Sequence, residues 1–154
     1  MADWRLIDGR YPADHDDALP AKAIESEFEL VQELDRLREL EPGIFTLNSP
    51  TGEALQIGIG GPLAGLRWFE NPQTSVNSRD VLADRPSCPG RVDFHAEDEE
   101  VPFWPEHLLP VEQAIDIVVF FFTNQRLPDW VAWEEWDSTH HHWNVHRPAV
   151  LRSG

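Results

Sequence analysis

The segment His95-Ala96-Glu97 is the first candidate for chemistry, because zinc deaminases place a histidine two residues before a glutamate. In those enzymes the histidine binds zinc and the glutamate moves protons. They also need a P-C-x-x-C motif downstream, whereas the only cysteine of this chain, Cys88, lies upstream. A strand that ends in an acidic turn is therefore the favoured interpretation of this segment.

A second candidate is the group of histidines near the C-terminus, His140, His141, His142 and His146, since imidazole nitrogens bind transition metals. Residues four apart share one face of a helix, but this segment carries no helix signals, and adjacent histidines cannot all face one ion in an ordered element. A solvated tail is favoured. A metal-dependent enzyme that uses these histidines stays open as a hypothesis.

Motifs for nucleophilic catalysis and phosphate binding are also absent. Cys88 stands between a serine and a proline with nothing to stabilise a thiolate, and no G-x-S-x-G motif occurs. Gly58, Gly60 and Gly61 are not followed by the lysine of a P-loop. We therefore expect that the protein is not an enzyme and needs no cofactor and no metal.

Three clusters of carboxylates remain, and they favour binding over catalysis. The clusters are Asp14, Asp16 and Asp17; Glu97, Asp98, Glu99 and Glu100; and Glu134, Glu135 and Asp137. None contains the motif of an EF-hand calcium loop, and most of these side chains are expected on a solvated surface. The second cluster lies beside Phe103 and Trp104, a combination typical of protein interfaces. There, charge raises the association rate and an aromatic residue anchors the complex.

The overall charge narrows the class of partner. The chain has 28 Asp and Glu against 12 Lys and Arg, for a formal net charge of -16. Nucleic acids and acidic membrane surfaces would be repelled as direct partners, whereas a basic protein would be attracted. Acidity that only keeps the protein soluble stays open as the alternative.

A single cysteine gives no internal disulfide, and the longest apolar run, residues 117–122, is too short for a membrane helix, so we expect a cytoplasmic protein.

Hydrophobic periodicity predicts the elements of the first half. Apolar residues recur at spacings of three and four from residue 21 to the stop signal Pro42-Gly43, which predicts an amphipathic helix. Alternating apolar residues predict strands at residues 44–48, 55–59 and 63–70.

The second half begins with residues 71–90, which are polar, rich in proline and predicted to form a long connection. A short strand is predicted at residues 91–95 and a last one at 130–136. Between them, Pro110 suits the first turn of a helix that continues to Asn124. Residues 117–122 are apolar on all sides and would also suit a buried strand, but Glu112-Gln113 in the first turn and Asn124 at the end favour a helix buried on most sides.

This order of elements predicts an α+β fold, with a mostly antiparallel sheet and two main helices packed on one face. We expect a single domain over residues 1–137, whose first 20 residues form an arm with room for one short strand. Residues 138–154 have no hydrophobic period and should form a loosely held or disordered tail.

Four short motifs follow one another in the C-terminal third: Leu109-Pro110-Val111-Glu112-Gln113-Ala114-Ile115, Phe120-Phe121-Phe122, Gln125-Arg126-Leu127-Pro128 and Val131-Ala132-Trp133. This series resembles the C-terminal signature of the first-numbered immunity-protein family of bacterial polymorphic toxin systems. Upstream, Leu55-Gln56-Ile57-Gly58-Ile59 and Leu66-Arg67-Trp68-Phe69 look like the central hairpin of that family. The resemblance covers about residues 43–136. It departs from the pattern where Leu127 separates Arg126 from Pro128.

The resemblance implies a protein that neutralises a toxin, often a nucleic-acid deaminase, by binding over its active site. The expected partner is a cognate toxin domain with a basic surface, and the free protein is expected to be a monomer. We expect the contact surface to contain Trp68, Glu70, Asn77, Glu97, Asp98, Glu99, Glu100, Trp104 and Glu135. The alternative is an acidic adaptor or nucleic-acid mimic that regulates a host nucleic-acid-binding protein.

Overall fold

The computed structural model describes residues 3–12, 14–71, 77–86, 88–97, 99–137 and 142–146. Its elements in chain order are β1 Trp4–Asp8, β2 Lys22–Ile24, α1 Glu27–Leu37, β3 Gly43–Asn48, β4 Ala54–Ile59, β5 Leu63–Phe69, β6 Asn77–Leu82, β7 Val92–Ala96, β8 Glu99–Phe103, the 3-10 helix η1 Pro105–His107, β9 Leu109–Pro110, α2 Val111–Asn124, β10 Ala132–Asp137 and β11 His142–His146.

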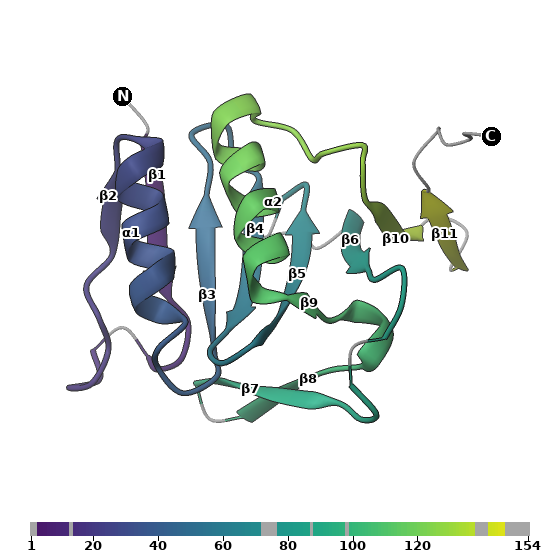
Figure 1. The fold of residues 1–154 in the computed structure, drawn as a ribbon. Coiled ribbons are helices and arrows are strands. Elements are labelled where there is room, and N and C mark those ends of the chain that lie inside the picture. The colour runs from purple at the N-terminus through teal and green to yellow at the C-terminus, as the bar shows by residue number, and fades with distance from the viewer. Residues whose placement is uncertain are drawn as a thin grey trace.

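A large sheet runs through the molecule in the strand order β11-β10-β6-β5-β4-β3-β1-β2. Its pairs along this path are antiparallel, and the β7–β8 hairpin joins it through a short parallel pairing of β7 with β3. Figure 1 shows α1 and α2 lying next to each other on one face of this sheet. The predicted α+β fold, with a mostly antiparallel sheet and both helices on one face, is confirmed.

Helix α1 begins at a pair of capping hydrogen bonds similar to a capping box. Ser26 Oγ accepts a hydrogen bond from the backbone N–H of Glu29, and the Glu29 carboxylate accepts one from the backbone N–H of Glu25. Leu30, Leu34 and Leu37 then occupy one stripe of the helix and are fully buried. The helix therefore starts later than residue 21, because the cap fixes its first turn and the residues before it pair as β2.

Helix α2 is apolar on most sides, as the sequence predicts, and packs on the middle of the sheet. Its buried residues include Ala114, Ile117, Val118 and Phe121. Gln125 ends it in the left-handed conformation, and its backbone N–H donates to the carbonyl oxygen of Phe121 at 2.7 Å.

The opposite face of the sheet, here called the back face, carries a second small core under the β7–β8 hairpin. Phe94 and Phe103 pack edge to face, with ring centroids 5.3 Å apart, and both are fully buried. Gly58 and Gly65 face each other across β4 and β5. A Cβ atom at Gly65 would lie 2.2 Å from the Phe103 ring, so this position has no space for a side chain.

The prediction of a connection over residues 71–90 is wrong in its middle, where β6 lies. Polar residues such as Arg79 and Asp80 hid this strand, because its apolar alternation is weak. Their charges are compensated by neighbouring strands, since Asp80 pairs with Arg67 on β5 and Arg79 pairs with Glu135 on β10. These contacts join residues far apart in the sequence.

Both ends of the chain also differ from the prediction. The short strand expected in the N-terminal arm is β1, but it pairs with β2 and β3 inside the sheet and therefore belongs to the body of the domain. Instead of belonging wholly to a loose tail, residues 142–146 form β11, which pairs with β10 and sets Trp143 opposite Trp136. Among the described residues, no helix is long and apolar enough to span a membrane.

Candidate functional site

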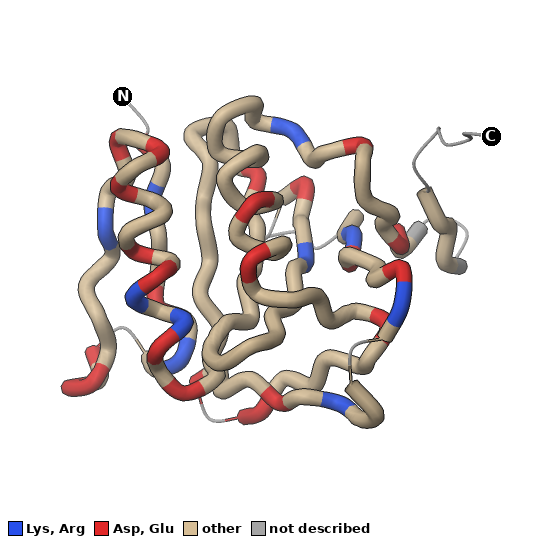
Figure 2. Tube along the Cα trace, viewed as in Figure 1, with Lys and Arg blue, Asp and Glu red and all other residues tan. Residues whose placement is uncertain are grey.

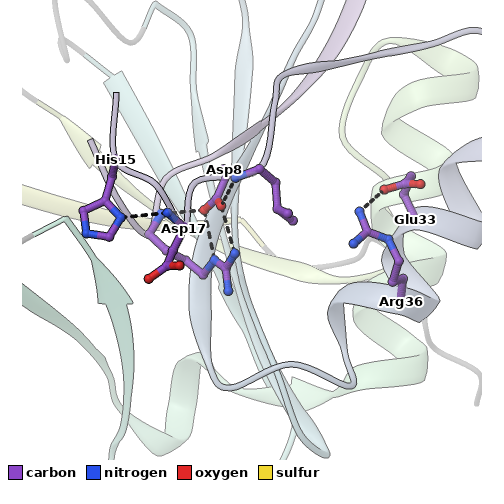
Figure 3. Close-up of polar contacts among 7 residues, drawn as sticks. Asp8, His15, Asp17, Glu33 and Arg36 are labelled. Carbon is purple, nitrogen blue, oxygen red and sulfur yellow. Dashed lines mark hydrogen bonds and ion pairs between the residues drawn. The ribbon is translucent and has the colours of Figure 1, made fainter. Parts of the chain in front are cut away.

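The carboxylate of Asp8 fixes the segment that follows β1 (Figure 3). It accepts hydrogen bonds from the backbone N–H groups of Arg10 and Leu19, at 2.8 and 2.9 Å, and from the Arg10 guanidinium at 3.0 and 2.9 Å. Burial alone would raise the pKa of Asp8, but these hydrogen bonds and the charge of Arg10 together lower it. One side chain thus ties both ends of the loop between Asp8 and Leu19.

The positive charge of Arg10 is neutralised by contacts within and beneath this loop. Its guanidinium lies 5.2 Å from the centroid of the Tyr11 ring and 5.1 Å from that of Phe45, and its side chain is only 13% exposed. Gly43 leaves room for it, because a Cβ atom there would come within 2.5 Å of the Arg10 side chain. Arg10 therefore offsets Asp8 and presents little positive charge outside.

Tyr11 brings the loop against the β7–β8 hairpin. Its ring stacks on His15 at 4.6 Å and meets His95 at 5.4 Å, while the backbone N–H of Glu97 donates to the carbonyl oxygen of Gly9. An open groove of about 450 Å³ results, lined by Tyr11, Glu41, Pro42, Asp93, His95 and Glu100. The N-terminal loop, the turn after α1 and the hairpin meet here.

We call this surface the acidic end, and Figure 2 shows its acidic segments along the lower edge of the molecule. It comprises the exposed carboxylates of Asp14, Asp16, Asp17, Glu41, Asp93, Glu97, Glu99 and Glu100. Asp93 lies 3.2 Å from Arg91, and Glu100 lies 3.6 Å from His95. No basic side chain of the described residues forms an ion pair with Glu41, Glu97 or Glu99. The groove therefore has a surplus of negative charge.

The hairpin residues expected from the sequence are only partly brought together. Glu97, Glu99 and Glu100 belong to the acidic end, and Asp98 lies outside the described residues. Trp104 is 49% exposed, but it follows the far end of β8, where the Arg91 guanidinium lies 5.7 Å from its ring centroid. Phe103 is buried in the back-face core and is not available to a partner.

A second group of expected residues meets on β5, β6 and β10. The Asn77 side chain donates to the carboxylate of Glu70 at 3.0 Å, and Trp68 lies opposite Arg79 in the register of β5 and β6. The Arg79 guanidinium lies 5.6 Å from the Trp68 ring centroid and 3.3 Å from the Glu135 carboxylate. Trp68, Glu70, Asn77 and Glu135 thus form one cluster, apart from the acidic end (Figure 1).

Within this second cluster the charge of Glu135 is compensated, whereas the exposed Glu70 is bonded to the neutral amide of Asn77. Glu135 is held by Arg79 and, at 2.8 Å, by His146 of β11. Burial raises the pKa of the nearby Glu53, the Trp68 indole opposes that rise, and the charge of Glu70 adds to it. Because Glu135 is paired and Glu70 is the other carboxylate of the cluster, this surface carries less surplus negative charge than the acidic end and attracts a basic partner less strongly.

A third feature is a half-open pocket of about 460 Å³ between the β1–β2 segment and α1. Leu6, Leu37 and Phe45 contribute apolar side chains to its wall. On α1, Glu33 lies 2.7 Å from Arg36 (Figure 3) and 3.5 Å from Lys22. Burial would raise the pKa of Glu33, but these two cations lower it. The pocket therefore has an apolar wall, and at its rim the charged side chain of Glu33 forms ion pairs with Arg36 and Lys22.

The groove residues Tyr11, Glu41 and Asp93 were not among the expected site residues. The cluster of carboxylates around Asp14 and Asp16 is recognisable in the sequence. No pattern in the sequence, however, places this cluster near residues 93–100. That proximity depends on Asp8 closing the loop and on Tyr11 packing against His95.

No known protein-family model matches the chain, and no curated protein shows significant similarity to it.

Proposed function

We propose that this chain is a cytoplasmic immunity protein that binds a cognate toxin domain and covers its active site. The toxin part of the proposal depends on the resemblance described above. Residues that carry the resemblance, such as Leu109, Ala114 and Trp133, are buried, so they support a fold and do not form the contact surface. The contact surface must come from other residues.

The acidic end is the observation that carries the binding part of the proposal. Carboxylates from the turn after α1 and from the β7–β8 hairpin line one groove, which Tyr11 of the N-terminal loop completes. Asp8 offsets the charge of Arg10 in that loop. A toxin that acts on nucleic acid needs a basic substrate groove, because it must bind phosphates. An acidic surface competes for the same Lys and Arg side chains, and its field accelerates association. The inhibitor itself needs no catalytic group.

An acidic adaptor or nucleic-acid mimic is the second candidate function, and the same surface favours it. Such a protein would act on a nucleic-acid-binding protein of its own cell. The two functions differ in the phenotype that follows loss of the protein. An immunity protein is needed only when the toxin is present, whereas loss of an adaptor changes cells that lack the toxin.

Co-expression tests the proposal directly. Cells that produce the candidate toxin domain should survive only when this protein is also produced. A purified mixture should yield a complex of one toxin and one immunity protein, measured by light scattering. Death of the cells despite full expression of this protein, or no complex at micromolar concentrations, would show that it does not neutralise that toxin.

Charge reversal locates the contact surface. Glu99→Lys combined with Glu100→Lys should slow association with the toxin by at least about tenfold at low salt and reduce its salt dependence, because steering depends on local charge. Asp116→Lys with Asp129→Lys is the matched control. It changes the net charge equally, at exposed positions on α2 and after it. Stopped-flow rates that fall equally in both double variants would remove the acidic end from the interface.

A further inference from the structure

Three metal-ligating side chains meet on the back face of the sheet, away from the acidic end. Asp80 of β6 and Glu134 of β10 are register partners and therefore point to the same side. His107 ends η1, which is held to the segment after β6 by a hydrogen bond from the Ala83 backbone N–H to the Glu106 carbonyl oxygen at 2.8 Å. One ligand atom from each of these three side chains lies within 4.8 Å of the others.

These groups are shielded from solvent to different degrees. The exposed fraction of the side chain is 5% for Asp80, 14% for His107 and 28% for Glu134. The Arg67 guanidinium binds both carboxylate oxygens of Asp80 and fixes its orientation. Two carboxylates against one guanidinium leave an excess negative charge, which a bound cation would offset.

We propose that Asp80, His107 and Glu134 bind a divalent transition-metal ion of the Zn²⁺ type. The distance between His107 Nε2 and Glu134 Oε1 is 3.0 Å. Two ligand atoms of a tetrahedral zinc ion, each about 2.0–2.1 Å from the metal, lie about 3.3 Å apart, so only a small movement is needed. An imidazole nitrogen among the ligands favours zinc and its neighbours over Mg²⁺ and Ca²⁺, which prefer oxygen ligands.

Arg67 has the role of an outer-shell residue in this arrangement. Arg67 uses one lone pair on each oxygen of Asp80, and each oxygen keeps a second lone pair with which it could bind a metal ion. Arg67 also lines an open groove of about 510 Å³ on the back face, together with Phe69, Ser78, Trp136 and Trp143. Three protein ligands leave at least one coordination position for water or another ligand.

Zinc titration of the metal-free full-length protein tests this site. Calorimetry should show that the unmodified protein binds one Zn²⁺ ion. The variants His107→Asn and Glu134→Gln should each bind Zn²⁺ at least about tenfold more weakly, because loss of a residue that only supports a ligand already lowers metal affinity by about that factor. Co²⁺ should give visible absorption bands that disappear in the same variants. His95→Asn is the matched control, because His95 also lies near a carboxylate, Glu100, but outside the cluster.

The histidines near the C-terminus are the main competing site, so a variant with His140, His141, His142 and His146 all changed to Asn is titrated as well. This variant should keep the Zn²⁺ ion and the Co²⁺ bands. The proposal fails if the protein binds no Zn²⁺, if this variant loses the ion, or if Glu134→Gln binds it as tightly as the unmodified chain. His107 and Glu134 would then form an ion pair only. Circular dichroism checks the fold, and Glu134→Gln decides the question if His107→Asn does not fold.

Discussion

Asp8 shows how one buried carboxylate can shape a candidate binding surface. Four donor groups satisfy it, and they come from Arg10 and Leu19, on both sides of the loop that carries Tyr11 and the acidic residues 14–17. Because its side chain is only 2% exposed, loss of its charge would leave Arg10 without its partner in a mostly buried position.

We predict that Asp8→Asn lowers the free energy of unfolding by about 1–3 kcal/mol at pH 7. The pKa of Asp8 is lowered in the folded protein from its ordinary value of 3.8. Its contribution is therefore fully present above that ordinary value and is lost as the pH falls through the lowered pKa. Urea unfolding of both proteins from pH 7 down to pH 2.5 checks this, with the exposed Asp116→Asn as control. A difference that stays constant over this range would contradict the assignment.

At the scale of elements, the β7–β8 hairpin depends on the glycines beneath it. Phe94 and Phe103 lie directly over Gly58 and Gly65, where the sheet has no side chains. The hairpin packed there supplies Glu97, Glu99 and Glu100 to the acidic end. The position of the hairpin side of the groove therefore depends on how the hairpin packs against these two strands.

We predict that Gly65→Ala destabilises the protein by about 1–3 kcal/mol, because the new methyl group would overlap the buried Phe103 ring. Gly90→Ala is the matched control, since a Cβ atom there meets nothing within 4 Å. Denaturant midpoints measure both effects. Equal midpoints for the two variants would show that the hairpin moves away from the sheet without cost.

At the scale of the whole molecule, the net charge of -16 opposes folding through self-repulsion. Ion pairs relieve part of it, and Arg38 links the two helices through a two-pronged contact with Glu112 at 3.0 Å for each hydrogen bond. At the acidic end Asp93 pairs with Arg91, but within the described part of the chain Glu41, Glu97 and Glu99 form no ion pair with a basic side chain.

We predict that raising the NaCl concentration from 0.02 to about 0.3 M increases Tm by a few degrees at pH 7.5, because salt screens the repulsion between exposed carboxylates. The increase should be absent near pH 4.6, the isoelectric point, where the net charge vanishes. Scanning calorimetry at both pH values measures this. A Tm that is insensitive to salt at pH 7.5 would mean that repulsion among the carboxylates does not limit stability.

The amino-acid sequence by itself determined the fold class, both long helices and strands β3, β4, β5, β7 and β10. Their apolar residues recur with the period of the element, and that pattern depends only on near neighbours in the chain. Composition alone also determined the large negative charge and the expectation of a basic partner.

Only the tertiary structure decided where that charge is concentrated. Strands β6 and β11 gave no apolar pattern, because pairs such as Arg79 with Glu135 and Trp136 with Trp143 stabilise them across the sheet. The acidic end likewise depends on Asp8 closing a loop, and the cluster of Asp80, His107 and Glu134 depends on strand register. Each contact joins residues that are distant in the chain, and no local period can encode such a contact.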